Sequence, residues 1–331
     1  MRERRSDYDV TNTVQVSSPA AVRDAAIDLF SQVFDRGQLN TIRKAFNDFS
    51  DLFLGELDGF HGCETVYHDM QHTLDMSLAT ARLIVGYEKT APETERLGLE
   101  RATVGQIVAL FHDSGYIRRE REKELVTGSE LTRHHVSRSA EFLKEYLPTV
   151  GLGHTAEIAA TIVHFTGMER SPADIEVADP LYRKIGHLVG TADLIAQMAD
   201  RCYLEKCRDR LFPEFVLGGI AMTAEKDTGK LHVLYESGED LLKKTPEFFK
   251  MTSRDRLDGA FGKAYQYFEA VFDGRNPYID SVEKNLAFLQ EVIASNSWPM
   301  LRRSPPCFTW KSDDLGYTQR LAALKIQNLK S

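Results

Sequence analysis

Histidines and aspartates recur in this sequence at spacings that could place them around one centre. His68 and His72 are four residues apart, and Asp75 follows three residues later. On one α-helix this spacing would put all three side chains on the same face. Two imidazoles and a carboxylate on the inward face of an amphipathic helix are costly to bury unless a metal ion or a proton-transfer role satisfies them. The spacing therefore predicts a metal or acid–base site.

The dipeptide His112-Asp113 ends the apolar segment 104–111, just before the turn signal Ser114-Gly115. A carboxylate at the buried end of a helix is poorly explained by packing alone. Adjacent helical residues point about 100° apart, so both reach one centre only if that centre lies near the helix end. There, Asp113 could bridge two metal ions.

Three further candidates lie among apolar or small residues: His135, His164 and Asp193. Taken singly, a histidine on an apolar helix face is more often a satisfied core residue than a ligand. Their combination with the candidates above, spread over five expected helices, favours a shared metal centre. Imidazole and carboxylate ligands suit Zn, Mn, Fe, Ni or Mg, and the absence of thiol pairs argues against a structural zinc.

Several of these segments resemble known motifs. Residues 67–75, Tyr-His-Asp-Met-Gln-His-Thr-Leu-Asp, resemble the Tyr-His-Asn-x-x-His-x-x-Asp signature of class I cyclic nucleotide phosphodiesterases. Residues 109–116 resemble the His-Asp motif of the HD superfamily of metal-dependent phosphohydrolases. Residues 135–140 are similar to the His-Glu-x-x-Ser-Ala segment of small bacterial HD domains. With the later histidine and aspartate, the resemblance covers about residues 60–212.

The resemblance implies a role for each candidate. A first divalent metal ion would be held by His72, His112, Asp113 and Asp193. Asp113 would bridge to a second ion, completed by His135 and His164. His68 would be the general acid that protonates the leaving oxygen after a metal-activated water attacks phosphorus. Asp75 would orient a ligand histidine without touching the metal. His134 is an alternative to His135.

The motif departs from the family at Asp69, where the signature has Asn, and at Tyr116, where the eukaryotic enzymes carry His. Their purine-binding Gln and Phe have no assignable counterparts. We therefore expect a metal-dependent phosphodiesterase or phosphomonoesterase acting on a nucleotide or other small phosphoester, and the motifs give no ground for cyclic nucleotide specificity. Two alternatives remain open: an HD-type di-iron oxygenase, and a non-catalytic HD sensor that binds a metal or ligand.

A mixed-charge run follows the His-Asp turn. Its cations Arg118, Arg121 and Lys123 are candidates for binding a substrate phosphate. The alternative is a solvated charged loop.

The elements that position these residues are helical. Apolar residues recur at three- and four-residue intervals in the expected helices 39–57, 65–87, 99–113, 129–146 and 180–207. Only 230–235 is strand-like, and it is isolated. The pattern predicts an all-α chain, and the resemblance implies an HD-domain bundle with additional terminal helices. We expect an N-terminal arm and helices (1–59), a metal-binding domain (60–212) and a helical extension (213–331) packed on the same core. Residues 1–18 look like a loose arm.

Composition narrows the partners. The net charge of -8 and pI near 5.7 give no support for a nucleic-acid surface. Four scattered cysteines are typical of a reduced, cytoplasmic protein. No stretch approaches the ~18 apolar residues of a membrane span, and the charged N-terminus is unlike a signal peptide. The partner expected is a small phosphoester, and a homo-oligomer is compatible with the sequence.

Overall fold

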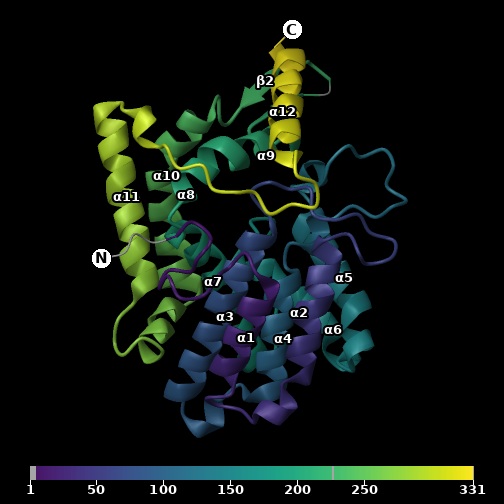
Figure 1. Ribbon diagram of the computed structural model, residues 1–331, viewed down its shortest axis with the longest axis vertical. Coiled ribbons are helices and arrows are strands. Elements are labelled where there is room, and N and C mark those ends of the chain that lie inside the picture. The colour runs from purple at the N-terminus through teal and green to yellow at the C-terminus, as the bar shows by residue number, and fades with distance from the viewer. Residues whose placement is uncertain (1–4, 226, 331) are drawn as a thin grey trace.

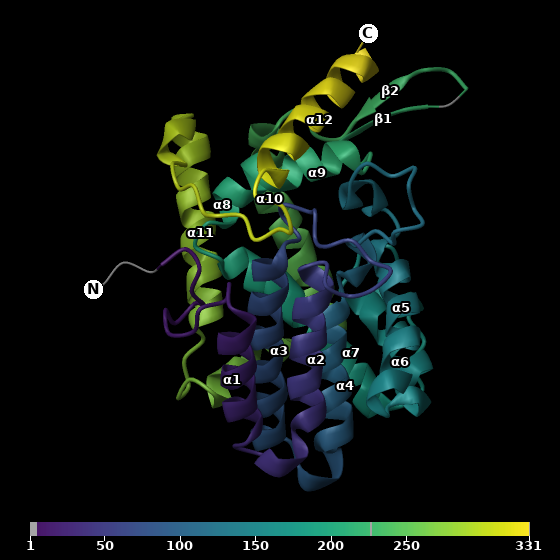
Figure 2. The same cartoon turned by 45° about the vertical axis from the view of Figure 1, so that its right-hand side comes forward.

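The computed structural model describes residues 5–225 and 227–330, which are mostly helical. A bundle of long helices forms one half of the molecule (Figures 1 and 2). Its members are α1 (Pro19–Phe30), α2 (Asn40–Phe53), α3 (Met70–Thr90), α4 (Gly98–Phe111) and α7 (Pro180–Ala199). Two helices flank it, α5 (His135–Tyr146) and α6 (Ala156–Ile162). The expected all-α class is confirmed for the described residues.

The other half is built from the C-terminal part of the chain. It contains α8 (Tyr203–Lys206), α9 (Phe212–Leu217), α10 (Gly238–Thr252), α11 (Pro277–Ser295) and α12 (Asp314–Lys330). A hairpin of β1 (Met222–Ala224) and β2 (Leu231–Val233) projects beside α12 (Figure 2). The strand-like stretch 230–235, expected to be isolated, therefore has a partner. The sequence pattern did not indicate β1, because its three residues are too few to show a period of their own.

Local capping decides where α3 begins. The Asp69 carboxylate accepts a hydrogen bond from the His72 backbone N–H at 3.1 Å, so Asp69 is the N-cap and the helix starts at Met70. The expectation of a helix from residue 65 is wrong at this end. His68 consequently lies in the turn before α3 and does not share a helical face with His72.

The end of α7 is also earlier than expected. Asp200 leaves the helical conformation, with ψ of 131°, and α7 ends at Ala199. The Asn285 side-chain amide on α11 donates 2.8 Å hydrogen bonds to the carbonyls of Met198 and Asp200, which replace partners lost at the helix end. The chain then continues through α8 into a π-helical turn, η9 (Cys207–Leu211).

The N-terminal segment packs on the bundle, contrary to the loose arm expected from its polarity. Asp9 is fully buried, and its carboxylate lies 2.6 Å from the Arg82 guanidinium on α3. Arg82 also donates a 2.7 Å hydrogen bond to the Tyr278 hydroxyl on α11. Residues 1–4 of the expected arm lie outside the described residues. One cluster of buried apolar side chains extends from Val16 to Leu301.

No helix among residues 5–225 and 227–330 combines the length and apolar character needed to cross a bilayer.

Candidate metal centre

Two buried imidazoles and a buried carboxylate converge where α3 passes the end of α4. Ligand atoms of His72, His112 and Asp113 all lie within 4.8 Å of one another. Asp113 Oδ2 is 3.4 Å from His72 Nε2 and 3.2 Å from His112 Nε2. His112 caps the C-terminus of α4, and Asp113 follows directly, before the short 3₁₀ turn η3 (Ser114–Tyr116). The sequence predicted this placement at the helix end.

The fourth predicted ligand, Asp193, comes from the middle of α7. Its Oδ1 lies 3.5 Å from His72 Nε2 and 3.7 Å from His112 Nε2. A Cβ at Gly186 would collide with the Phe165 ring, so glycine there lets the turn η7 (Val163–Phe165) approach α7 closely. Helices α3, α4 and α7 together place four potential ligands in one buried group. We call these residues, His72, His112, Asp113 and Asp193, the metal group.

The electrostatics of this group favour a cation. Burial acts to lower the pKa of His72, but the carboxylates of Asp113 and Asp193 outweigh it and raise the pKa to about 10. Burial likewise acts to raise the pKa of Asp113, yet the adjacent His112 holds it well below its usual range. His112 Nε2 and Asp113 Oδ2 are buried and make no hydrogen bond. Buried polar atoms that make no hydrogen bond are costly even beside an opposite charge, and a coordinated ion would satisfy them.

Backbone contacts leave the ligand nitrogens available. His112 Nδ1 lies 2.8 Å from the Ala109 carbonyl, and His135 Nδ1 lies 2.7 Å from the Thr132 carbonyl. A carbonyl can only accept, so each Nδ1 carries a proton and each neutral ring keeps its Nε2 lone pair. His135 Nε2 is 3.7 Å from Asp113 Oδ1, whereas His72 and His112 lie nearer to Oδ2.

His68, the predicted general acid, is held by a partner that the sequence did not indicate. Its Nδ1 lies 2.7 Å from Glu214 Oε2, while Glu214 Oε1 accepts a 2.6 Å hydrogen bond from the Tyr67 backbone N–H. Glu214 is fully buried on α9. The Tyr116 ring stacks on both His68 and His135, with centroids 4.6 and 4.3 Å away, and the two histidine rings lie 6.1 Å apart. These contacts direct His68 Nε2 away from Glu214.

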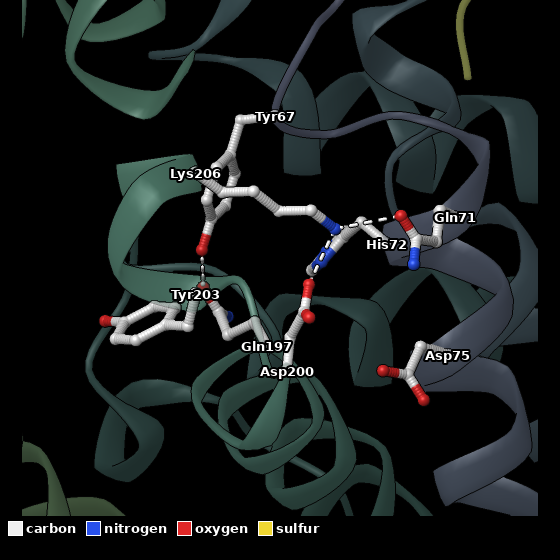
Figure 3. Close-up of a pocket in the computed structure, with 8 residues that line it drawn as sticks. All are labelled: Tyr67, Gln71, His72, Asp75, Gln197, Asp200, Tyr203 and Lys206. Carbon is white, nitrogen blue, oxygen red and sulfur yellow. Dashed lines mark hydrogen bonds and ion pairs between the residues drawn. The ribbon is translucent and has the colours of Figure 1, made fainter. Parts of the chain in front are cut away.

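A small polar cavity lies behind His72 (Figure 3). The buried Lys206 ammonium forms a 2.6 Å ion pair with Asp200 and donates a 3.0 Å hydrogen bond to Gln71. Asp75, predicted to orient a ligand histidine, is buried and lines this cavity one turn beyond His72. At about 10 Å³ the cavity is the size of one water molecule.

Two other predicted residues are not among those whose ligand atoms lie within 4.8 Å of one another around His72. His164 is buried in η7, and its Nδ1 makes no hydrogen bond and lies 4.0 Å from Glu169 Oε2. His134 lines a separate surface cavity, whereas His135 faces the metal group. The geometry therefore favours His135 over His134 as the candidate metal ligand.

A larger cavity of about 430 Å³ opens onto His68 and the metal group. Arg118, Arg121 and Lys123 do not line it. The Arg118 guanidinium makes a two-pronged ion pair with Glu64 at 2.7 and 2.8 Å, and Arg121 lines the separate surface cavity. Among the described lining residues the cations are Arg133 and Lys244, which the sequence did not single out.

Comparison of the chain with protein-family models, with curated proteins and with solved structures finds no match in any of the three.

Proposed function

We propose that the protein is a metal-dependent hydrolase of phosphoric esters, a phosphodiesterase or phosphomonoesterase acting on a nucleotide or another small phosphoester. One observation carries the proposal. The buried group of His72, His112 and Asp113, joined by Asp193, opens onto the same cavity as a histidine paired with a buried carboxylate. Potential metal ligands and a proton donor on one cavity are the parts that hydrolysis needs.

The residues fit a divalent ion in number and chemistry. Two imidazole nitrogens and two carboxylates are donors that Zn, Mn, Fe and Ni accept, and carboxylates also suit Mg. His135, beyond Asp113, offers a nitrogen for a second ion that Asp113 would bridge. A bound divalent ion would polarise the phosphoryl group and lower the pKa of the attacking water.

The chain's own residues would handle the leaving group. Glu214 orients the His68 ring through Nδ1, so Nε2 is left to carry a proton toward the cavity. As a water oxygen bonds to phosphorus, the P–O bond to the leaving group breaks, and the leaving oxygen takes the proton from His68 Nε2. The attacking water releases a proton that restores His68. The products are an alcohol and a phosphate, with no redox change.

The direct test is metal analysis combined with hydrolysis of p-nitrophenyl phosphate and bis-p-nitrophenyl phosphate. We expect the wild type to bind one or two divalent ions per chain and to hydrolyse at least one substrate. Asp113→Ala should lose both properties. Asp314→Asn is a matched control, because Asp314 is also buried but lies on α12, outside the cavity lining.

A metal-loaded wild type that hydrolyses neither these esters nor a panel of nucleotides would refute the proposal. Iron content with substrate-dependent oxygen uptake would instead indicate the di-iron oxygenase. Metal binding and activity retained by Asp113→Ala would refute the site assignment.

A further inference from the structure

The larger cavity has two unlike ends. At one end, the candidate metal ligands come from α3, the end of α4 and α7. The segments η9, α9 and α10 contribute instead apolar side chains, among them Leu211, Phe215, Leu241 and Phe248. Phe215 stacks with Tyr235, whose ring also lines the cavity, at 6.1 Å between centroids. One continuous space thus joins a polar end to an apolar wall.

The cations of the lining are already paired. Lys244 Nζ donates to the Leu234 carbonyl at 2.7 Å and to the Asp240 carboxylate at 2.9 Å, and it lies 5.5 Å from the centre of the Tyr235 ring. The exposed Arg133 donates to the Gly219 carbonyl. Within the described lining, no further lysine or arginine is available to neutralise a chain of phosphates.

The negative charges of the lining also disfavour a chain of phosphates. Asp113, Asp193 and Glu169 all line this cavity. A polyphosphate would bring several more negative charges beside these carboxylates, which costs free energy unless cations compensate it. A single phosphoryl group at the metal end needs only the metal ion and His68.

We propose that the ligand of this cavity is a monoester or diester of a single phosphate whose organic group is uncharged and largely apolar, either alkyl or aryl. The phosphoryl group would lie at the metal group and the organic group against the wall from η9, α9 and α10. This inference rests on the proposed function for the position of the phosphoryl group, and it excludes nucleoside di- and triphosphates as preferred substrates.

Binding of non-hydrolysable phosphonates tests this inference separately from catalysis. Alkylphosphonates from methyl to hexyl, phenylphosphonate and pyrophosphate would be titrated into Mn²⁺-loaded protein by calorimetry. Burial of a methylene favours binding by about 0.8 kcal/mol, so affinity should rise about threefold to fourfold per methylene. The alkyl and phenyl series distinguish a chain-shaped group from an aromatic one.

Paired variants locate the apolar contact. Phe248→Ala should weaken hexylphosphonate binding about tenfold or more and leave methylphosphonate unchanged. Phe249→Ala is the matched control. The Phe249 side chain is next to Phe248 on α10, but it packs on the main core and does not line the cavity. This control should leave the dependence on chain length intact.

The outcomes separate the two proposals. Affinity that rises with chain length while no ester is hydrolysed would support this inference and refute the hydrolase. Affinity that is flat with chain length, or highest for pyrophosphate, would overturn this inference even if esters are hydrolysed. An equal loss of methyl- and hexylphosphonate binding in Phe248→Ala would overturn the placement of the organic group.

Discussion

The pairing of His68 with Glu214 determines which nitrogen of the histidine faces the cavity. Glu214 accepts from the Tyr67 backbone with one oxygen and contacts His68 Nδ1 with the other. A buried carboxylate held at both oxygens is a rigid support, because neither oxygen can turn to water. At the residue scale, Glu214 is therefore a positioning residue for the proposed proton donor.

Glu214→Gln should lower kcat about tenfold to hundredfold, because an amide cannot hold the protonated His68 ring as a carboxylate does. Metal content and KM should change little, since Glu214 does not contact the ligand residues. The pH profile of kcat should shift as well, which a purely structural defect would not produce. In a double-mutant cycle, His68→Gln combined with Glu214→Gln should be no worse than His68→Gln alone. Additive losses would contradict the pairing.

We expect the stability of the protein to depend on pH through His187 on α7, which is not one of the candidate site residues. Its ring packs against Phe165 and Phe261, with centroids 5.2 and 5.5 Å away. Burial, with the positive charges of Lys184 and Arg183, lowers its pKa to about 4. The unfolded chain therefore binds a proton at His187 between about pH 6.5 and pH 4, while the folded chain does not. Stability must fall as the pH falls through this window.

The difference in unfolding free energy between wild type and His187→Phe should change by about 2 kcal/mol between pH 7 and pH 5, with the wild type losing more. Urea titrations at the two pH values measure it. Parallel pH dependences in the two proteins would show that His187 is not buried in its neutral form.

At the scale of elements, the start of α3 depends on a segment from the far end of the chain. The Asp69 carboxylate caps α3, accepts a 3.0 Å hydrogen bond from the Phe308 backbone and lies 3.5 Å from the buried Arg210 guanidinium. The Met70 backbone donates in turn to the Phe308 carbonyl at 3.2 Å. This junction lies between His68 and His72, so it sets the position of both histidines.

Asp69→Ala should destabilise the protein by about 3 kcal/mol or more, because the cap is lost and Arg210 remains buried without its carboxylate. Metal affinity should fall at least tenfold as His72 loses its support. Ser18→Ala removes a cap from α1, which carries no site residue; it should cost about 1 kcal/mol and leave metal affinity unchanged. Denaturation and competitive metal titration measure the two effects. Equal metal affinities in both variants would show that the junction does not position the site.

At the scale of the whole molecule, one buried ion pair joins three distant parts of the chain. Arg82 on α3 contacts Asp9 of the N-terminal segment and Tyr278 of α11. Helix α11 also packs along α7, which carries Asp193. These contacts tie the N-terminal segment and α11 to the bundle that holds the candidate site. That all of residues 213–331 share its core stays a prediction.

Asp9→Asn should destabilise the protein by about 3–5 kcal/mol, because it leaves the buried Arg82 charge uncompensated. The exposed pair of Arg23 and Asp24 is the control, and Asp24→Asn should change stability by less than about 1 kcal/mol. Unfolding followed by circular dichroism and by Trp298 and Trp310 fluorescence should give one coincident transition. Two separate transitions would indicate that the C-terminal extension folds independently.

Local signals were sufficient for the helical class and for much of the candidate site. Apolar residues at three- and four-residue spacing indicate the long helices. The spacing of His72 from His68 and Asp75 singles out His72, and the position at a helix end singles out His112 and Asp113; the structure groups the three. The apolar pattern extends this helix back to residue 65 because it does not show that the Asp69 carboxylate caps α3.

By itself, the sequence determined that the chain is helical and that His72, His112 and Asp113 are candidates for one metal site, because periodicity and unusual buried polar residues are properties of short segments. Only the tertiary structure decided that Glu214 supports His68, that Asp69 meets Arg210, and that an apolar wall faces the metal group. The first two pairs are separated by 146 and 141 residues. Contacts between residues so far apart in the sequence leave no periodic pattern in it. They depend on how the helices pack in space, and the local pattern of apolar residues does not specify that packing.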